Sequence, residues 1–258
     1  MSQYLNIALI QSHLLWENPR ANREAFSKKI TSIPQDVDLI ILPEMFSTGF
    51  TMSPKNIEAS EGEKTLKWMQ QQAKKSNVAV VGSIVFTENN QNFNRLFFVY
   101  PNGEYESYDK KHTFTLAGED KVYKAGNSKL IVDYKGYKIC PLVCYDLRFP
   151  VWARNVEDYD VLIYVANWPK PRIAAWDTLL KARAIENMSY CIGVNRIGLD
   201  GLGYEYSGHS AVYDVLGNQT GYSEKEEILY ATLDKEHIHS TRKKLKFLED
   251  RDQFSLLS

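Results

Sequence analysis

The stretch that most constrains the fold of this chain is an apolar run ending in a polar cluster, Ile139 to Pro150 (ICPLVCYDLRFP). Its apolar part is typical of a buried strand, and it places Cys144 directly before the polar residues YDLR. Pro150 then suits the first turn of a helix. Ligands of open α/β sheets bind beyond the carboxyl ends of the strands, so this layout predicts that the thiol of Cys144 lies at a ligand-binding site. An inert core thiol is the competing interpretation, since free cysteine is among the most buried residue types.

Apolar runs and amphipathic stretches alternate along the whole chain. The patterns predict strands at residues 4–11, 37–42, 78–86, 93–100, 104–110, 129–134, 137–144, 160–167, 190–195, 207–215 and 227–233. They predict helices at residues 18–30, 61–75, from 150, 173–188 and about 234–246, and a loop at 115–127. The alternation occurs twice, which predicts an α/β fold of two similar halves packed sheet on sheet. We expect a single domain over residues 1–258, with 235–258 as a C-terminal helix and tail.

Composition narrows the function classes. The net charge is −1, and acidic and basic residues are interspersed along the chain. The sequence therefore gives no sign of a basic surface for nucleic acid or an anionic membrane. The basic run 242–246 is interpreted as a solvated helix face. Three cysteines at spacings unlike those of metal sites argue against a disulfide framework and against a zinc or iron centre. No run approaches the length of a membrane span and no signal sequence is recognisable, so a cytoplasmic protein is expected.

Two further charged residues stand where predicted strands end. Glu44 follows the strand at 37–42, and Lys110 closes the hairpin strand at 104–110. A carboxylate in a partly apolar pocket can act as a general base, and a nearby ammonium favours a thiolate or an oxyanion. The alternatives are a capping carboxylate and a solvated lysine, since both residue types are mostly exposed.

Histidine is the usual partner of a nucleophilic cysteine. His112 and His209 lie in loop or strand-end contexts, so a Cys-His dyad is a second hypothesis. The chain lacks the local signatures of familiar Cys-His proteases, and the residues around Cys144 do not form a Gly-x-nucleophile-x-Gly elbow. No motif therefore supports the histidine route.

Three blocks in this order, LPEMFSTGF, YDKKHTF and LVCYDLRFP, resemble the signature blocks of the nitrilase superfamily, the carbon-nitrogen hydrolases with a Glu-Lys-Cys triad. The resemblance covers nearly the whole chain and includes WDTLLKARAIEN at 176–187. PEMFSTGF, LAGED and CYDLRFP are similar to the omega-amidase branch. Lys111 and Thr113 depart from the apolar residue and the leucine common at these positions, which leaves the shape of the pocket rim open.

The resemblance implies a role for each matching residue. Cys144 would be the nucleophile, Glu44 the general base and Lys110 the stabiliser of the oxyanion, while Glu119 would help to orient lysine and substrate. It also implies a four-layer αββα sandwich, a homodimer and no metal or organic cofactor. The implied reaction converts the terminal amide of a small dicarboxylate monoamide, of the 2-oxoglutaramate or 2-oxosuccinamate type, into the acid and ammonia through a thioester.

Three further residues complete this hypothesis. The backbone N–H of Tyr145 is expected to hold the oxyanion together with the lysine. Arg148 offers a planar fork for a distal carboxylate, although a structural pair with Asp146 or another acid is the alternative. Trp168 is expected either to wall the same pocket or to belong to the core. A different amide, carbamoyl or nitrile substrate and a non-catalytic amide-binding module are the rival functions.

Overall fold

The computed structural model describes residues 3–256 and contains two six-stranded sheets in that range. The first sheet has the order β14-β1-β2-β3-β4-β5, with β1 (Tyr4–Gln11), β2 (Leu39–Ile41), β3 (Ala79–Glu88), β4 (Gln91–Val99), β5 (Tyr105–Asp109) and β14 (Glu227–Asp234). The second has the order β13-β12-β9-β8-β7-β6, with β6 (Val132–Tyr134), β7 (Tyr137–Val143), β8 (Val161–Ala166), β9 (Tyr190–Asn195), β12 (Ser210–Tyr213) and β13 (Gln219–Ser223).

The two sheets share one pairing pattern. Read from β14 in the first sheet and from β6 in the second, each has an antiparallel pair, two parallel pairs and two antiparallel pairs. The prediction of two similar halves is therefore confirmed. Parallel strands need crossover connections, and the helices in those connections form the outer layers.

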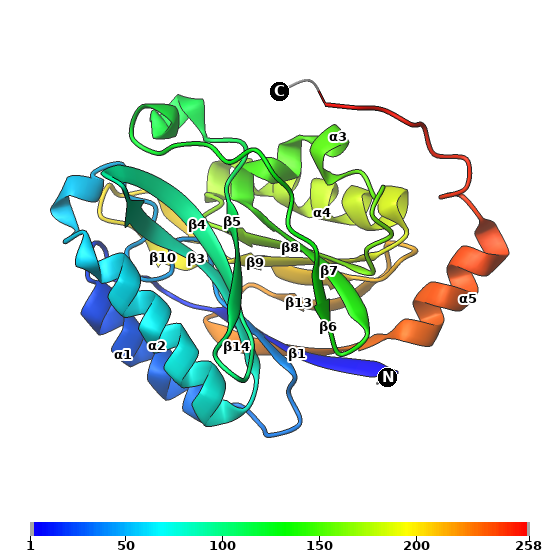
Figure 1. Ribbon diagram of the computed structural model, residues 1–258, viewed down its shortest axis with the longest axis horizontal. Helices are drawn as coiled ribbons and strands as arrows, with labels where there is room; N and C mark the ends of the chain where they lie inside the picture. Colours follow the sequence, from blue (N-terminus) through cyan, green and yellow to red (C-terminus); the bar gives the residue numbers. More distant parts are fainter. Residues whose placement is uncertain (1–2, 257–258) are drawn as a thin grey trace.

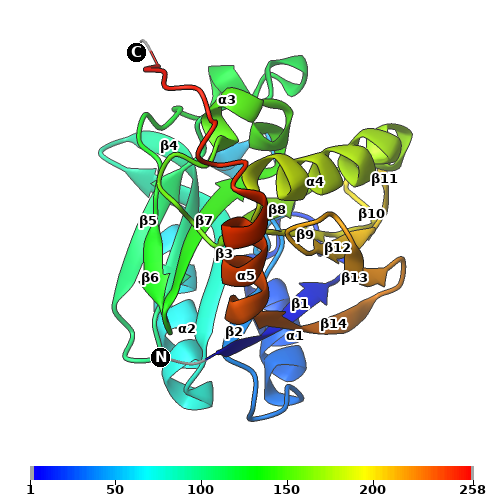
Figure 2. The same ribbon diagram turned by 90° about the vertical axis from the view of Figure 1, so that its right-hand side faces the viewer.

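Helices cover the outer face of each sheet, which gives four layers (Figures 1 and 2). These helices are α1 (Pro19–Thr31) and α2 (Ser60–Ser76) on the first sheet, and α3 (Pro150–Ala153) and α4 (Ile173–Asn187) on the second. Along β1, Leu5, Ile7 and Leu9 pack into the core shared with the second sheet, whereas Ala8 and Ile10 pack with the helical layer. Successive side chains of a strand point to opposite faces, so one apolar run supplies both interfaces. The predicted αββα sandwich is confirmed.

The last helix of the chain follows β14 of the first sheet. Helix α5 (Lys235–Leu245) and the tail behind it run along one side of the sandwich (Figure 2). Ile238 anchors the helix in the core, and Arg242 donates to the backbone carbonyls of Met188 and Tyr159. The predicted domain, 1–258, includes residues 1, 2, 257 and 258, which lie outside the described residues. Among residues 3–256, no helix combines the length and the apolar character that crossing a bilayer requires.

The structure differs from the predicted elements in three places. The predicted strand at 207–215 is divided, because Gly208 and His209 both have positive φ, 76° and 64°, which interrupts an extended strand. Its first part belongs to β11 (Glu205–Ser207), which pairs with β10 (Ile197–Leu199) in a separate ribbon. Strand β13 was not predicted, because QTGYS carries no apolar run. The predicted loop at 115–127 contains two short 3₁₀ turns, η2 (Thr115–Ala117) and η3 (Glu119–Lys121).

Candidate active site

The ends of strands from both sheets meet at one place. Glu44 lies just beyond β2, Lys110 directly follows β5, and Cys144 directly follows β7. Asn167 directly follows β8, the neighbour of β7, and links the sheets: its side-chain amide donates to the Glu44 backbone carbonyl at 2.6 Å. Glu44, Lys110 and Cys144 therefore lie at the same end of the two sheets, as the sequence led us to expect.

Lys110 lies at the centre of a buried polar cluster. Its Nζ is 2.9 Å from Glu44 Oε1 and 2.8 Å from Glu119 Oε2. The Asn94 side-chain amide donates to the same two carboxylates, at 2.8 Å to Glu44 and 3.1 Å to Glu119. Glu44 and Glu119 have no exposed surface and Lys110 is 1% exposed. Since a buried charge requires partners of opposite charge or hydrogen bonds, the cluster holds each member in one orientation.

Backbone donors fix the two carboxylates from the other side. The Asn167 N–H donates to Glu44 Oε2 at 2.8 Å, and the Phe114 N–H donates to Glu119 Oε2 at 2.6 Å. Each carboxylate therefore has one oxygen bound to Lys110 and Asn94 and further contacts to a loop that follows a strand. This arrangement limits the rotation of Glu44 about its side-chain bonds, as a positioned proton acceptor requires.

The electrostatics of the cluster keep the lysine charged. Burial alone would lower the pKa of Lys110, but the carboxylates of Glu119 and Glu44 outweigh it and raise the pKa. Burial raises the pKa of Glu119, with Lys110 opposing this effect and Glu44 adding to it. One ammonium thus faces two carboxylates in a dry site. It remains a cation at neutral pH and is available to stabilise a developing negative charge.

Cys144 occupies a strained backbone position. Its φ is +45°, a region that residues other than glycine rarely adopt, and it opens the short 3₁₀ turn η4 (Cys144–Arg148). Asp146 holds this turn: its Oδ2 accepts from the Val143 N–H at 3.0 Å and from the Tyr108 hydroxyl at 2.8 Å. The chain therefore builds a sharp turn at Cys144 without the glycines of the Gly-x-nucleophile-x-Gly elbow. Positive φ outside glycine often marks functional sites.

The surroundings of the Cys144 thiol favour its protonated form. Burial, and then the neighbouring Glu44 carboxylate, raises the pKa of the thiol well above its ordinary value, while Lys110 acts in the opposite direction. The sulfur lies 4.0 Å from the Asn167 carbonyl oxygen. A thiol in this state needs a base at the moment of attack, and Glu44 is the adjacent carboxylate.

This protonation state can be measured directly. The ultraviolet difference spectrum of the native protein minus Cys144→Ala should show no thiolate absorbance at about 240 nm between about pH 6 and pH 9. Cys140 and Cys191 do not interfere, because burial raises the pKa of both thiols as well. A thiolate band at neutral pH that disappears in Cys144→Ala would contradict the assignment of Glu44 as the base.

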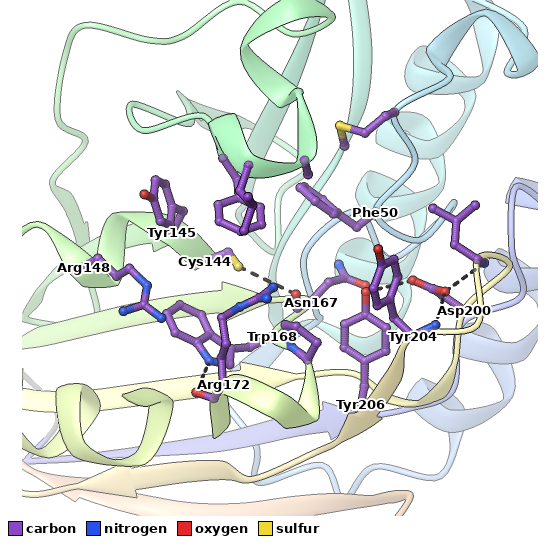
Figure 3. A pocket seen from close by; sticks show the side chains of 16 residues that line it. Phe50, Cys144, Tyr145, Arg148, Asn167, Trp168, Arg172, Asp200, Tyr204 and Tyr206 are labelled. Carbon is purple, nitrogen blue, oxygen red and sulfur yellow. Dashed lines mark hydrogen bonds between the residues drawn. The ribbon is translucent and has the colours of Figure 1, made fainter. Parts of the chain in front are cut away.

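A pocket of about 320 Å³ leads from the surface to Cys144 (Figure 3). Cys144 lies on its wall, and Lys110, Glu44 and Glu119 lie behind that wall. The volume is at the small end of the range for ligand pockets. The wall includes Phe50, Phe114, Tyr145, Arg148, Asn167, Trp168, Arg172, Asp200, Tyr204 and Tyr206. It therefore suits a small molecule with an apolar middle and a charged end.

Comparisons with known proteins identify the family. A model of the carbon-nitrogen hydrolase family matches residues 6–243. The chain belongs to the carbon-nitrogen hydrolase family. It is 41% identical over 254 residues to omega-amidase YafV of Escherichia coli K12, covering 98% of both chains. It is 30% identical over 250 residues to 2-oxoglutaramate amidase of Bacillus subtilis, covering 95% of this chain and 96% of the relative. The predicted enzyme class, a carbon-nitrogen hydrolase of the amidase kind, is confirmed.

Solved structures of carbon-nitrogen hydrolases have the same fold. A superfamily protein from Xanthomonas campestris, described with an arsenic adduct in its active site, matches with a TM-score of 0.96. It is 38% identical, and the match covers 99% of this chain and 100% of the other. Nit3 of Saccharomyces cerevisiae, described as a member of branch 10 of the nitrilase superfamily, matches with a TM-score of 0.84 at 24% identity, covering 95% of each chain.

The two histidines of the Cys-His hypothesis do not lie on the wall of the pocket in this carbon-nitrogen hydrolase. His112 Nδ1 is 2.8 Å from Asp146 Oδ1, and its ring stacks on Phe149. His209 Nδ1 is 3.0 Å from Asp177, and neither histidine is on the wall of the pocket. These positions give no support to a Cys-His dyad.

The structure also places the residues expected at the substrate end. The guanidinium carbon of Arg148 lies 4.8 Å from the centre of the Trp168 ring, and both residues line the pocket. Asp146 bonds to the turn and to His112 instead, so the alternative pair with Arg148 does not form. Tyr145 lies in the first turn of η4, where leading backbone N–H groups have no partner within the turn. Its N–H is therefore in a position to act as a donor beside Cys144.

Several residues of this site were not anticipated, and Asn94 and Arg172 are the two with the clearest contacts to it. Asn94 lies inside β4 between Phe93 and Arg95, and the sequence gives no sign that its side chain is buried. Arg172 lies in the WPKPR segment, which was interpreted as a connection before the long helix. Its presence on the pocket wall depends on how the chain turns after β8, and no residue pattern encodes that turn.

Proposed function

We propose that this carbon-nitrogen hydrolase hydrolyses the terminal amide of a small dicarboxylate monoamide, of the 2-oxoglutaramate or 2-oxosuccinamate type, to the acid and ammonia. The observation that carries the proposal is one pocket with the thiol of Cys144 and the guanidinium of Arg148 on its wall. The names of the E. coli and B. subtilis relatives support the same substrate class.

The first half of the reaction forms a thioester. Glu44 accepts the thiol proton as the sulfur of Cys144 attacks the amide carbon. The Lys110 ammonium and the Tyr145 N–H hold the oxyanion of the tetrahedral intermediate. The carbon-nitrogen bond then breaks, Glu44 returns its proton to the leaving nitrogen, and ammonia departs.

The second half restores the enzyme. A water molecule gives a proton to Glu44 and attacks the thioester carbon, with the new oxyanion held by the same two donors. The carbon-sulfur bond breaks, the sulfur recovers its proton from Glu44, and the acid leaves. Glu119, bonded through both oxygens to Lys110 at 3.0 and 2.8 Å, keeps the lysine oriented throughout.

Arg148 is proposed to bind the distal carboxylate of the substrate. Its guanidinium stacks on Trp168 and presents a planar fork on the pocket wall, the geometry that suits a carboxylate. In Arg148→Ala, kcat/KM for 2-oxoglutaramate and succinamate should fall by about ten- to hundredfold, the usual effect of losing a charged hydrogen bond. Small uncharged amides should be hydrolysed as well as before, or better.

Ammonia release from 2-oxoglutaramate, succinamate, glutamine and a nitrile, compared side by side, tests the proposed function. Arg148→Lys is the matched control, because it keeps the charge but loses the two-pronged geometry, and it should give an intermediate result. Faster ammonia release from the nitrile than from every carboxylate-bearing monoamide would contradict the proposal. So would an Arg148→Ala variant that keeps the native preference for those monoamides.

A further inference from the structure

A second arginine lies on the same wall of the pocket as Arg148. Arg172 ends the short 3₁₀ turn η5 (Lys170–Arg172), directly before α4. Its backbone carbonyl accepts the Trp168 indole N–H at 2.8 Å, and its guanidinium carbon lies 5.2 Å from the centre of the Phe114 ring. Figure 3 shows Arg148, Trp168 and Arg172 together along one wall near Cys144. Two cations therefore border a space sized for one small molecule.

These two guanidinium groups are available to a ligand. Within residues 3–256, neither Arg148 nor Arg172 forms a salt bridge, whereas Lys170, two residues from Arg172, pairs with Glu205 at 2.8 Å. Each guanidinium instead rests on an aromatic ring, Trp168 for Arg148 and Phe114 for Arg172. Stacking of this kind fixes the plane of the fork and leaves its N–H groups free to donate.

The only carboxylate on the described pocket wall is already occupied. Asp200 Oδ1 accepts the backbone N–H groups of Leu202 and Tyr204, both at 2.9 Å. Its Oδ2 accepts the Tyr206 hydroxyl at 2.9 Å. An ammonium group on a substrate would thus find two positive charges and an acid whose oxygens already have donors. The pocket is complementary to a carboxylate end that carries further acceptors and no amine.

We propose that Arg172 is a specificity-determining residue that binds the carboxylate end of the substrate together with Arg148 and disfavours amides carrying an α-ammonium. This inference rests on the proposed function and extends it. The carboxylate and keto oxygens of a 2-oxo acid offer adjacent acceptors for two forks. An α-ammonium at the same place offers only donors and meets like charges, which weakens its binding in a partly dry pocket.

The experiment compares kcat/KM for 2-oxoglutaramate, glutaramate, glutamine and propionamide. In Arg172→Gln, the values for 2-oxoglutaramate and glutaramate should fall by about ten- to hundredfold, as expected for a lost charged hydrogen bond. Propionamide has no carboxylate and should be unaffected. Glutamine should lose less than 2-oxoglutaramate and glutaramate, because the loss of a bond to its carboxylate is offset by the loss of repulsion on its α-ammonium. Arg172→Lys should give intermediate values. Lys170→Gln, which removes a cation of the same turn that is not among the residues of the pocket wall, should leave all four values unchanged.

Each outcome separates this inference from the proposed function. If Arg172→Gln lowers all four values equally, the residue shapes the pocket and the assignment is wrong. An unchanged preference for 2-oxoglutaramate over glutamine in Arg172→Gln would also overturn the assignment, while the proposed function would stand. A native enzyme that prefers propionamide to both carboxylate-bearing monoamides would overturn the two together. The melting temperature of each variant shows whether the fold is intact. We expect it to be unchanged, because the Trp168 indole N–H donates to the backbone carbonyl of residue 172, which every variant keeps.

Discussion

Replacing Cys144 by alanine is expected to lower the rate of ammonia release by about a thousandfold or more, because the variant has no nucleophile to form the thioester. The fold should remain intact, since alanine removes only the sulfur atom from the core and the contact of the thiol with the Asn167 carbonyl oxygen, at 4.0 Å, is weak. A coupled ammonia assay gives the rate, and thermal unfolding gives the stability.

Cys140 provides a matched control for this variant. It lies four residues before Cys144, inside β7, and it is completely buried in the core. Cys140→Ala should lose some stability through a small cavity but keep its turnover number. Ammonia release by Cys144→Ala at a rate near that of the native protein would show that the chemistry lies elsewhere.

The Glu44→Gln variant is expected to lose turnover by about a hundredfold to ten-thousandfold, the usual contribution of a positioned proton-transfer group. The amide has nearly the same shape but cannot take the thiol proton, and the thiol does not ionise by itself because burial raises its pKa. KM should change little, because Glu44 lies behind the pocket wall. Steady-state kinetics with 2-oxoglutaramate separate the two parameters.

Glu61→Gln is the matched control, because it removes an ion pair away from the pocket by the same chemical change. Glu61 is a partly buried acid on α2 that pairs with Arg23 at 2.7 Å, and it is not on the pocket wall. Its replacement should leave turnover unchanged. If Glu44→Gln behaved like this control, another group would have to be the proton acceptor.

The sequence predicts much of this fold because buried strands leave a strong signal. The runs that became β2, β7 and β8 are nearly continuous apolar stretches, and each ends close to a residue of the site, namely Glu44, Cys144 and Asn167. Cys144 and Glu44 could therefore be placed at strand ends from the pattern alone. Their roles came from the resemblance of three sequence blocks to the nitrilase superfamily, and family membership is now established.

Burial of the lysine could not be predicted from local pattern. Lys110 stands at the end of a hairpin, where no periodicity indicates core packing. It is buried because Glu44 and Glu119, 66 and 9 residues away in sequence, supply the opposite charge. The residues of the pocket wall could not be predicted for the same reason. Strands β10 and β11 and the turn carrying Arg172 are short segments whose positions depend on tertiary contacts.

The central claim is that Cys144 carries the acyl group during turnover. Intact-protein mass spectrometry of enzyme quenched in acid while it hydrolyses 2-oxoglutaramate tests it most directly. We expect a species heavier than the native protein by the mass of the substrate minus ammonia, located on the peptide containing Cys144 and missing from Cys144→Ala. Full turnover with no such adduct at any quench time, or an adduct that persists in Cys144→Ala, would contradict it.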